Sequence, residues 1–190
     1  MSQKSEKVWI EKTIGAVITA AGAGERGGAS WALQKLQGMT AVEHIVVNFQ
    51  RAGVKDIVIV AGAQSEEMKK KLKGFGVTFL QNEDCRQSEM IDSVRLGLEY
   101  LSERCSKVFI CPVDVPFFSM RTVEKLLASD GAVVIPSYDN RGGHPVVLTD
   151  EIFSDIINYQ GTEGLRGAIR ALAEKPKYVG LEDEGVASPI

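Results

Sequence analysis

A glycine-rich stretch near the N-terminus carries the clearest chemical signal in this sequence. It runs from Ala20 to Gly28, and four of its last seven residues are glycines: Gly22, Gly24, Gly27 and Gly28. Without a Cβ, glycine lets successive backbone N–H groups turn toward one point, so a loop can bind phosphate without side chains. Arg26 lies among these glycines and adds a planar, permanently charged phosphate donor. The stretch therefore predicts a phosphate-binding loop.

The spacing of Gly22, Gly24 and Gly27 also satisfies the GxGxxG pattern of dinucleotide-binding proteins. Such a site needs a helix that opens at the last glycine and an acidic residue at the end of the second strand. Here the residues after Gly27 are a poor helix start, and the second expected strand runs into Ala61–Ala63 without an acid. A dehydrogenase therefore stays an alternative only. The sequence supports a P-loop NTPase even less, because the lysine-containing P-loop pattern is absent.

Short apolar runs alternate with helical patterns along the whole chain. Runs rich in β-branched residues predict strands at 14–20, 57–60, 77–80, 108–110, 132–135, 145–148 and 178–180. Helical spacing predicts helices at 41–52, 65–73, 90–101, 119–127, 150–158 and 163–173. This order predicts a single α/β domain over residues 1–190, three-layered, with a mostly parallel, Rossmann-like sheet. Ligands bind at the carboxyl ends of such strands, so we expect the chemistry in the loops after Ala20, Val60, Leu80, Ile110 and Leu148.

Composition excludes several classes of protein. The chain has 190 residues, of which 44% are hydrophobic and 25% charged, as in ordinary globular domains. Its net charge of −3 offers no basic surplus, so we expect no nucleic-acid partner. No apolar run approaches the roughly 18 residues of a membrane span, and Met1–Lys7 lead into no signal-type apolar core. Three cysteines without a CxxC pair are typical of a cytoplasmic protein.

Several short motifs, in the right order, resemble those of the MobA-like nucleotidyltransferases, which include the guanylyl- and cytidylyltransferases of molybdenum cofactor maturation. Residues 18–28 look like the family signature LAAGxGxRMG, and 36–38 like its PLxG segment. Further matches are GMxxSLRxGL at 90–98, the DMP or DQP tip at 113–116, GHP at 143–145 and a GDxGAR turn at 161–166. The resemblance covers residues 14–170 and implies the sheet of the nucleotide-diphospho-sugar transferases.

The resemblance implies a reaction. A substrate phosphate attacks the α-phosphate of an NTP, with CTP or GTP favoured, and pyrophosphate leaves. The implied acceptor is a phosphorylated small molecule of the molybdopterin type, with a sugar phosphate or methylerythritol phosphate as alternatives. The implied cofactor is Mg²⁺, a hard cation suited to carboxylate and phosphate oxygens. The resemblance also allows a molybdoenzyme as a partner.

The same resemblance assigns roles to residues of this sequence. Arg26, Lys35 and Asp114 are the expected catalytic residues, with Arg26 on the β- and γ-phosphates and Asp114 as the Mg²⁺ ligand. His144 and Pro145 are expected beside the acceptor, where His144 positions a phosphate that is already ionised. The expected nucleotide-binding residues are Ala20, Ala21, Gly22, Ala23, Gly24, Arg26, Gly28, Ala61, Gly62, Asn82, Met90 and Ser93.

Three departures from the family pattern keep a second interpretation open. Trp31 stands where the family has a phosphate-facing lysine, and Lys35 is the nearest lysine. Thr162 replaces the aspartate of the turn at 161–166. The family's DxDTxxD stretch is expected after Leu181, where Asp183 and Glu184 do not match it. A protein of the same fold that binds nucleotide or cofactor without turnover therefore remains the alternative function.

Overall fold

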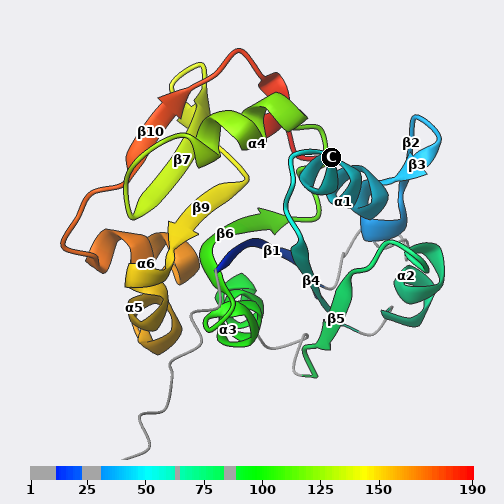
Figure 1. Cartoon of the computed structure of the whole chain (residues 1–190), viewed down its shortest axis with the longest axis horizontal. Coiled ribbons are helices and arrows are strands. Elements are labelled where there is room, and N and C mark those ends of the chain that lie inside the picture. Colours follow the sequence, from blue (N-terminus) through cyan, green and yellow to red (C-terminus); the bar gives the residue numbers. More distant parts are fainter. Residues whose placement is uncertain (1–11, 23–30, 63–64, 84–88) are drawn as a thin grey trace, which may run out of the picture.

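The computed structural model describes residues 12–22, 31–62, 65–83 and 89–190, and it shows one twisted sheet between two layers of helices (Figure 1). The strand order is β10-β7-β9-β6-β1-β4-β5, with β8 paired to the far end of β7. This arrangement confirms the expected three-layer α/β fold. The strands are β1 (Thr13–Ala20), β4 (Asp56–Ala61), β5 (Thr78–Gln81), β6 (Cys105–Pro112), β7 (Val133–Tyr138), β8 (Arg141–Gly142), β9 (Val146–Thr149) and β10 (Lys177–Gly180).

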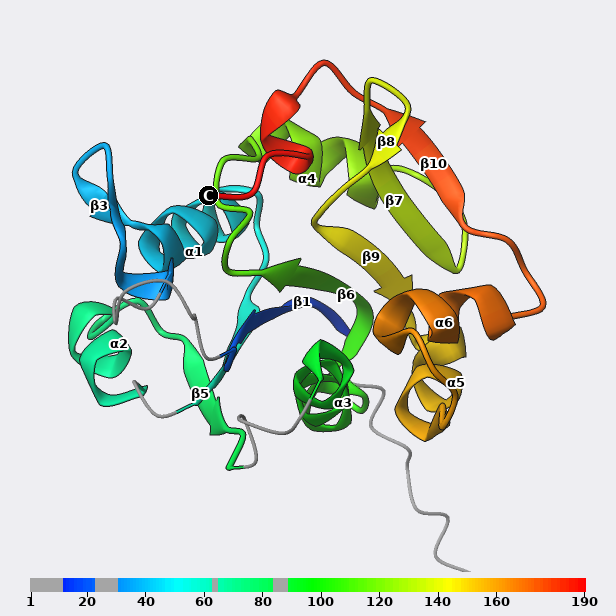
Figure 2. The same cartoon turned by 180° about the vertical axis from the view of Figure 1, so that it is seen from behind.

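Helices cover both faces of this sheet (Figures 1 and 2). One face carries α1 (Ala41–Arg51), α2 (Ser65–Lys71) and α4 (Met120–Leu127), and the other carries α3 (Met90–Leu101), α5 (Phe153–Asn158) and α6 (Gly164–Ala171). Single-turn 3₁₀ helices lie at Trp31–Leu33, Asp150–Ile152 and Glu184–Val186. No helix among the described ranges is long and apolar enough to cross a membrane.

The central strand β1 shows why two helical layers are needed. Ala16 and Ile18 belong to the core cluster under α1, whereas Val17 belongs to the cluster under α3. Successive side chains of a strand point to opposite faces, so a strand that is apolar throughout must be covered on both sides. The uninterrupted apolar run that predicted this strand is therefore explained by its position in the middle of the sheet.

Strand direction corrects one expectation. β1 pairs in parallel with β4 and β6, and β4 pairs in parallel with β5, but β9 runs antiparallel to both β6 and β7. The loop after Leu148 therefore lies at the edge opposite to the carboxyl ends of the parallel strands, and its expected place at the site is wrong. His144 and Pro145, which precede β9, lie instead at the edge of the sheet where the parallel strands end, which we call the chemical edge.

Two small hairpins were not expected from the sequence. β2 (Lys35–Leu36) pairs with β3 (Met39–Thr40) in a separate ribbon, and β8 folds back on the end of β7. Strands of two residues carry no readable periodicity, so only their turns give a signal. In the second turn Asp139 and Asn140 both have positive φ, the conformation in which aspartate and asparagine are tolerated best after glycine.

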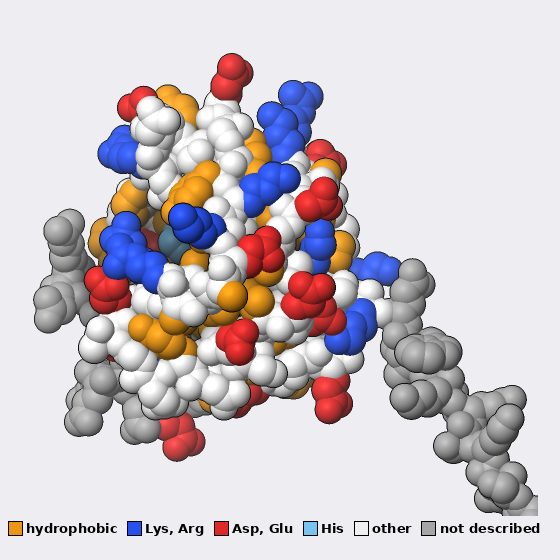
Figure 3. All heavy atoms as spheres, turned by 90° about the vertical axis from the view of Figure 1, so that its left-hand side faces the viewer, with side chains coloured by type: hydrophobic (Ala, Val, Ile, Leu, Met, Phe, Trp, Pro, Cys, Tyr) orange, Lys and Arg blue, Asp and Glu red, His pale blue; other side chains and the backbone are white. Residues whose placement is uncertain are grey.

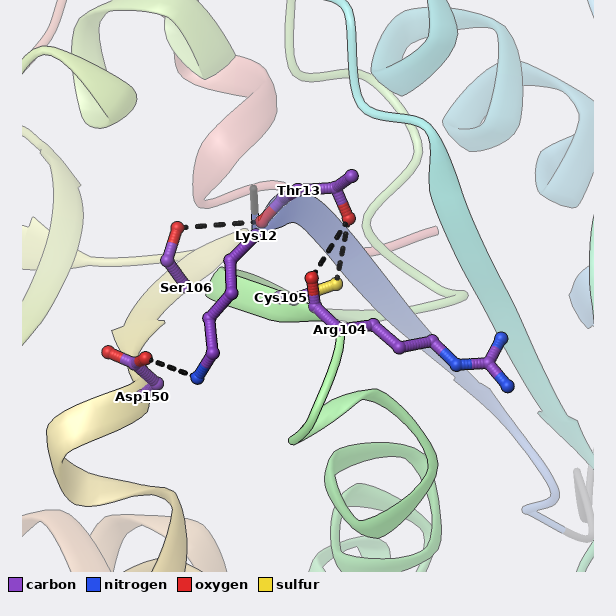
Figure 4. Close-up of polar contacts among 6 residues, drawn as sticks. All are labelled: Lys12, Thr13, Arg104, Cys105, Ser106 and Asp150. Carbon is purple, nitrogen blue, oxygen red and sulfur yellow. Dashed lines mark hydrogen bonds and ion pairs between the residues drawn. The ribbon is translucent and has the colours of Figure 1, made fainter. Parts of the chain in front are cut away.

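Polar contacts hold the strand starts at the edge away from the site (Figure 4). Lys12 forms a 2.7 Å ion pair with Asp150, and the Thr13 hydroxyl contacts the Cys105 sulfur at 3.4 Å (Figure 4). Burial raises the pKa of the Cys105 thiol, although the hydrogen bond from Thr13 acts in the opposite direction. The thiol therefore stays neutral, in line with the buried structural role that cysteines most often have.

The close approach of α3 to β1 generates a prediction. A Cβ at Gly97 would lie 2.5 Å from each Cγ atom of Val17. We expect Gly97→Ala to lower the free energy of unfolding by about 1–3 kcal/mol because the core is overpacked. Helix propensity alone would give the opposite sign, by about 1 kcal/mol. Urea denaturation measures the difference, and added stability in the variant would refute the close packing.

A second variant tests the cause. Val17→Ala removes the two methyl groups that Gly97→Ala meets, so the double variant should be more stable than the sum of the two single effects. Simple additivity would show that the cost of Gly97→Ala arises elsewhere.

Candidate functional site

Small residues end the two central strands at the chemical edge. Ala20 and Ala61 are paired in register, and Ala21 and Gly62 follow them in buried positions. The N–H of Val113, which follows β6, donates to the carbonyl of Thr19 at 3.1 Å. With no large side chain at these strand ends, the backbone there can be approached closely by a flat ligand.

A buried polar pair links β5 to α3 beside these strand ends. The Asn82 backbone N–H donates to the Ala61 carbonyl at 2.9 Å, and its side-chain amide donates to the Ser93 hydroxyl at 3.2 Å. Both side chains are almost inaccessible to solvent, and buried polar groups of this kind are normally fully hydrogen-bonded. The structure thus brings together four of the expected nucleotide-binding residues, Ala20, Ala61, Asn82 and Ser93.

Asp114 lies in the turn directly after β6, at the same edge. Its side chain is half-buried, and burial raises the pKa of the carboxyl group, with its own backbone N–H acting in the opposite direction. Asp114 forms no ion pair within the described part of the chain, where no cluster of three metal-ligating side chains occurs either. A carboxylate that is partly desolvated and lacks a cation is suited to receive one.

The segment 181–190 crosses this edge and contacts the end of β7 and two loops. The N–H of Leu181 donates to Ser137, the N–H of His144 donates to Val186, and the N–H of Ile190 donates to Asp114, each to a carbonyl oxygen at 2.8 Å. The passage is tight, because a Cβ at Gly143 would lie 1.9 Å from the Val186 oxygen. The segment therefore packs against both the Asp114 turn and the loop before β9.

Asp183 serves the fold rather than a ligand. Its carboxylate accepts from the N–H groups of Ser119 and Gly185, at 2.8 and 3.1 Å, and from the Thr122 hydroxyl. Burial alone would raise the pKa of Asp183, but these hydrogen bonds outweigh it and hold the pKa below its usual value. The carboxylate is thus committed to the start of α4, where a negative charge stabilises the helix end.

A cleft opens on the same side of the sheet as α3 and α6, and it contains His144. Its volume is about 430 Å³, within the range of small-molecule sites. Figure 3 shows this face, where Lys and Arg side chains lie beside apolar ones. The lining residues are Met90, Ile135, Gly142, Gly143, His144, Val146, Leu165, Arg166, Ile169, Arg170, Pro176 and Tyr178.

His144 is neutral in this cleft. Burial lowers the pKa of the imidazole to about 4, so the ring carries no charge near pH 7. A neutral ring can orient a ligand by a hydrogen bond but adds no positive charge. Met90, expected beside the nucleotide sugar, lines the same cleft as His144 and is 40% exposed.

The remaining expected residues differ in exposure and in their position in the fold. Gly22 is exposed after β1, Pro145 is buried before β9, and Lys35 lies in β2 with an exposed side chain. Trp31, in the 3₁₀ turn, packs against the core under α1. The expected phosphate-loop residues Ala23, Gly24, Arg26 and Gly28 lie outside the described residues.

Besides the apolar and glycine lining, sequence reasoning assigned no role to three polar side chains of the cleft, those of Arg166, Arg170 and Tyr178. The two arginines are four residues apart on α6, so they share a face of that helix. That spacing was visible in the sequence, but nothing in it showed which surface this face would meet. Tyr178 sits on an edge strand and gave no pattern of its own.

The pKa of His144 predicts an acid-side loss of stability. Its folded pKa, about 4, lies below the ordinary value of 6.5, so between these pH values the unfolded chain binds a proton that the folded chain does not. Stability therefore falls as the pH drops from 6.5 to 4, by up to about 3 kcal/mol from this residue, and is fully retained above 6.5.

We expect the free energy of unfolding of His144→Asn, measured by denaturant titrations at pH 4 to 8, to lack this part of the pH dependence. The matched variant His44→Asn, which removes the other histidine, should keep it. An identical pH dependence in His144→Asn and the unmodified chain would contradict a neutral His144 ring.

Comparison with known proteins places this geometry among the nucleotidyltransferases. The family model of the MobA-like NTP transferase domain matches residues 16–176. The bifunctional protein GlmU of Clostridium botulinum (strain ATCC 19397 / Type A) is 27% identical over 146 residues, which are 76% of this chain and 30% of GlmU. The chain thus spans less than a third of the length of that relative.

Solved structures share the fold. A nucleotidyl transferase from Methanothermobacter superposes with a TM-score of 0.80 at 20% identity, over 94% of this chain and 92% of the other. Rv0371c from Mycobacterium tuberculosis H37Rv, solved as a complex with manganese, gives a TM-score of 0.74 at 16% identity, over 90% and 89%. At these identities the likeness concerns the fold alone.

Proposed function

We propose that this chain, which belongs to the MobA-like NTP transferase family, transfers a nucleoside monophosphate from an NTP to a phosphorylated small molecule. The observation that carries the proposal is the position of Asp114. This half-buried carboxylate, without an ion-pair partner in the described structure, stands between the small-residue ends of β1 and β4 and the cleft that contains His144. An NTP on one side and an acceptor on the other would meet beside it.

The reaction is a displacement at phosphorus. A phosphate oxygen of the acceptor forms a bond to the α-phosphorus of the NTP, the bond from that phosphorus to the bridging oxygen breaks, and pyrophosphate leaves with the electron pair. The attacking phosphate is already ionised, so no general base is required, and His144, with a pKa of about 4, would be a weak one. Catalysis then depends on positioning and on balancing phosphate charge.

The chain's residues fit a divalent cation of the magnesium type. Mg²⁺ is usually bound by one or two carboxylates while substrate phosphates and water complete its shell. Among the described residues Asp114 is the carboxylate we assign to this role, and the structural neighbour Rv0371c was solved as a manganese complex. When bound, the ion would neutralise phosphate charge; Arg26 and Lys35 would supply further positive charge to the triphosphate.

For the finer identity of the substrates we retain CTP or GTP and an acceptor of the molybdopterin type, with a sugar phosphate or methylerythritol phosphate as the alternatives within the same fold. The base would lie against Ala20, Ala21, Ala61 and Gly62, and its ribose beside Ser93. Small residues there allow contact with the backbone, which can read a base by its hydrogen-bonding edge.

A second candidate function is nucleotide or cofactor binding without turnover. Two observations favour it: Trp31 packs against the core in place of the phosphate-facing lysine of the family, and Asp183 is committed to the start of α4. Both functions predict nucleotide binding, and they differ in pyrophosphate release.

A titration panel tests the proposal. CTP, GTP, ATP, UTP and NAD would be added with and without Mg²⁺ while thermal unfolding is followed. We expect one NTP to stabilise the chain only with Mg²⁺, by about 2.7 kcal/mol at a hundredfold excess over its dissociation constant. Stabilisation by NAD alone would favour a dehydrogenase, and no shift with any NTP would overturn the proposal.

Asp114→Asn gives the sharper prediction. Pyrophosphate release should fall about a hundredfold or more, since a charge that stabilises the transition state is lost. Thermal stability at pH 7 should be unchanged or higher, because burial raises the pKa of Asp114 and so penalises its charged form. The matched control Asp130→Asn removes an exposed acid and should retain activity. A loss of activity that follows a loss of stability would contradict the assigned role.

A further inference from the structure

The two ends of the sheet differ in how their edge strands are protected. β10 forms one end and β5 the other, and no described strand pairs with the free side of either (Figures 1 and 2). An edge strand offers unpaired N–H and C=O groups to another chain, and proteins commonly guard it with lysine or proline. β10 has both kinds of guard, because Lys175, Pro176 and Lys177 lie at its start.

β5 has no such guard. From Gly74 to Asn82 the chain contains no charged residue and no proline. The segment 77–81 consists mainly of β-branched and aromatic residues, which favour strands. Phe79 packs against the core cluster under α1 and Leu80 against the cluster under α3, so the strand is held from both faces. The free side of β5 is therefore an uncharged, firmly placed template for another strand.

The backbone groups on this free side can be assigned. The Asn82 N–H donates to the carbonyl of Ala61 in β4 at 2.9 Å. Backbone groups point to opposite sides at successive residues of a strand, so those of Val77, Phe79 and Gln81 point away from β4. In an antiparallel pair, two opposite residues exchange both of their hydrogen bonds. Two copies of the chain can therefore pair symmetrically, with each Val77 opposite a Phe79.

The side chains fit this register. It places Thr78 on the two-fold axis, opposite Thr78 of the partner subunit, and it places Val77 opposite Phe79 of the partner subunit. Threonine pairs and pairs of an aromatic with a β-branched residue are among the cross-strand contacts that stabilise antiparallel strands. The register is thus favoured by its side chains as well as by its backbone.

Charges beyond the strand match in the same register. Lys73 and Glu83 are equally distant from Thr78 in the sequence, so the symmetric pairing brings each Lys73 toward Glu83 of the partner subunit. Both side chains are exposed, and neither forms an ion pair within the described structure. A second copy would supply the opposite charge to each of them.

Helix α2 supplies a second charge match. It lies at the β5 end of the sheet (Figure 1), and the Ser65 hydroxyl at its start donates to the Gln81 side chain at 3.3 Å. Its first turn contains Glu66 and Glu67, and its last turn contains Lys69–Lys71. A two-fold axis perpendicular to the sheet sets the two α2 helices antiparallel on the same side of the joined sheet. The acidic start of each helix then faces the basic end of the other.

We propose that two copies of this chain associate through β5, antiparallel about a two-fold axis at Thr78, so that their sheets join into one. The charge matches favour a second copy over an unrelated partner, because both members of each pair come from this chain. Glu83 directly follows Asn82, so the interface ends beside an expected nucleotide-binding residue. The inference goes beyond the proposed function and does not depend on it.

Sedimentation velocity over a hundredfold range of protein concentration tests the association. We expect the mass to rise from that of one chain toward that of two. Val77→Pro removes an N–H that points away from β4, so it should weaken the dimer at least tenfold. The matched variant Val77→Ala keeps this N–H and should weaken the dimer much less. Urea denaturation shows whether both variants fold.

Charge reversal at exposed positions tests the register without touching the core. Lys73→Glu and Glu83→Lys should each weaken the dimer severalfold, because an attractive pair becomes repulsive. The double variant exchanges the two charges and should restore the affinity. Lys175→Glu makes the same charge change at the β10 end of the sheet, where it should leave the dimer unchanged.

Two results would overturn the inference. One is the mass of a single chain at every concentration, and the other is a dimer that the single charge reversals leave unchanged, which would place the interface elsewhere. Hydrogen exchange gives an independent readout: protection of the Phe79 amide should rise with protein concentration. NTP titration on the same preparations separates the two proposals. NTP binding by a single chain refutes the dimer alone, whereas a dimer that binds no NTP refutes the transferase alone.

Discussion

The antiparallel insertion of β9 between β6 and β7 is the constraint on which the rest of the site depends. Had β9 run parallel to β6, His144 would lie at the opposite edge of the sheet, away from the Asp114 turn. Because it is reversed, the start of β9 meets the ends of the parallel strands. One half of the edge then consists of strand ends with small residues, and the other of a cleft rimmed by α6.

The two halves of this edge expose different kinds of groups. At the ends of β1 and β4 the chain presents backbone and alanine, with one buried amide–hydroxyl pair at Asn82 and Ser93. In the cleft it presents side chains: apolar ones from the sheet, and arginines from α6. Asp114 lies between them as a half-buried carboxylate that forms no ion pair with any described residue.

Periodicity made much of the fold predictable, because long elements carry many residues in register. The run at 14–20 and the helical stripe at 90–101 correspond to β1 and α3 within a residue. Direction was not predictable, since the apolar run before Leu148 has the same pattern whichever way its strand runs. The ribbon of β2 and β3 was too short to be detected, having two residues in each strand.

The candidate site was predictable where a motif lies within one segment and not where segments meet. Asp114 follows a strand and His144 precedes one, and the motifs that contain them resemble those of a known family. The cleft is assembled from α3, α6, β7, β9 and β10, so its composition became readable only once the chain was folded. Asp183 is a similar case: its acid was visible in the sequence, but its commitment to the start of α4 follows from tertiary contacts.

The segment 181–190 has a further consequence for how the site works. It is hydrogen-bonded at Val186 to the loop before β9 and at Ile190 to the turn of Asp114, and Gly143 leaves it no spare room. Both turns thus share one mechanical support. A shift of either turn would therefore strain the hydrogen bonds of the segment that joins it to the other turn.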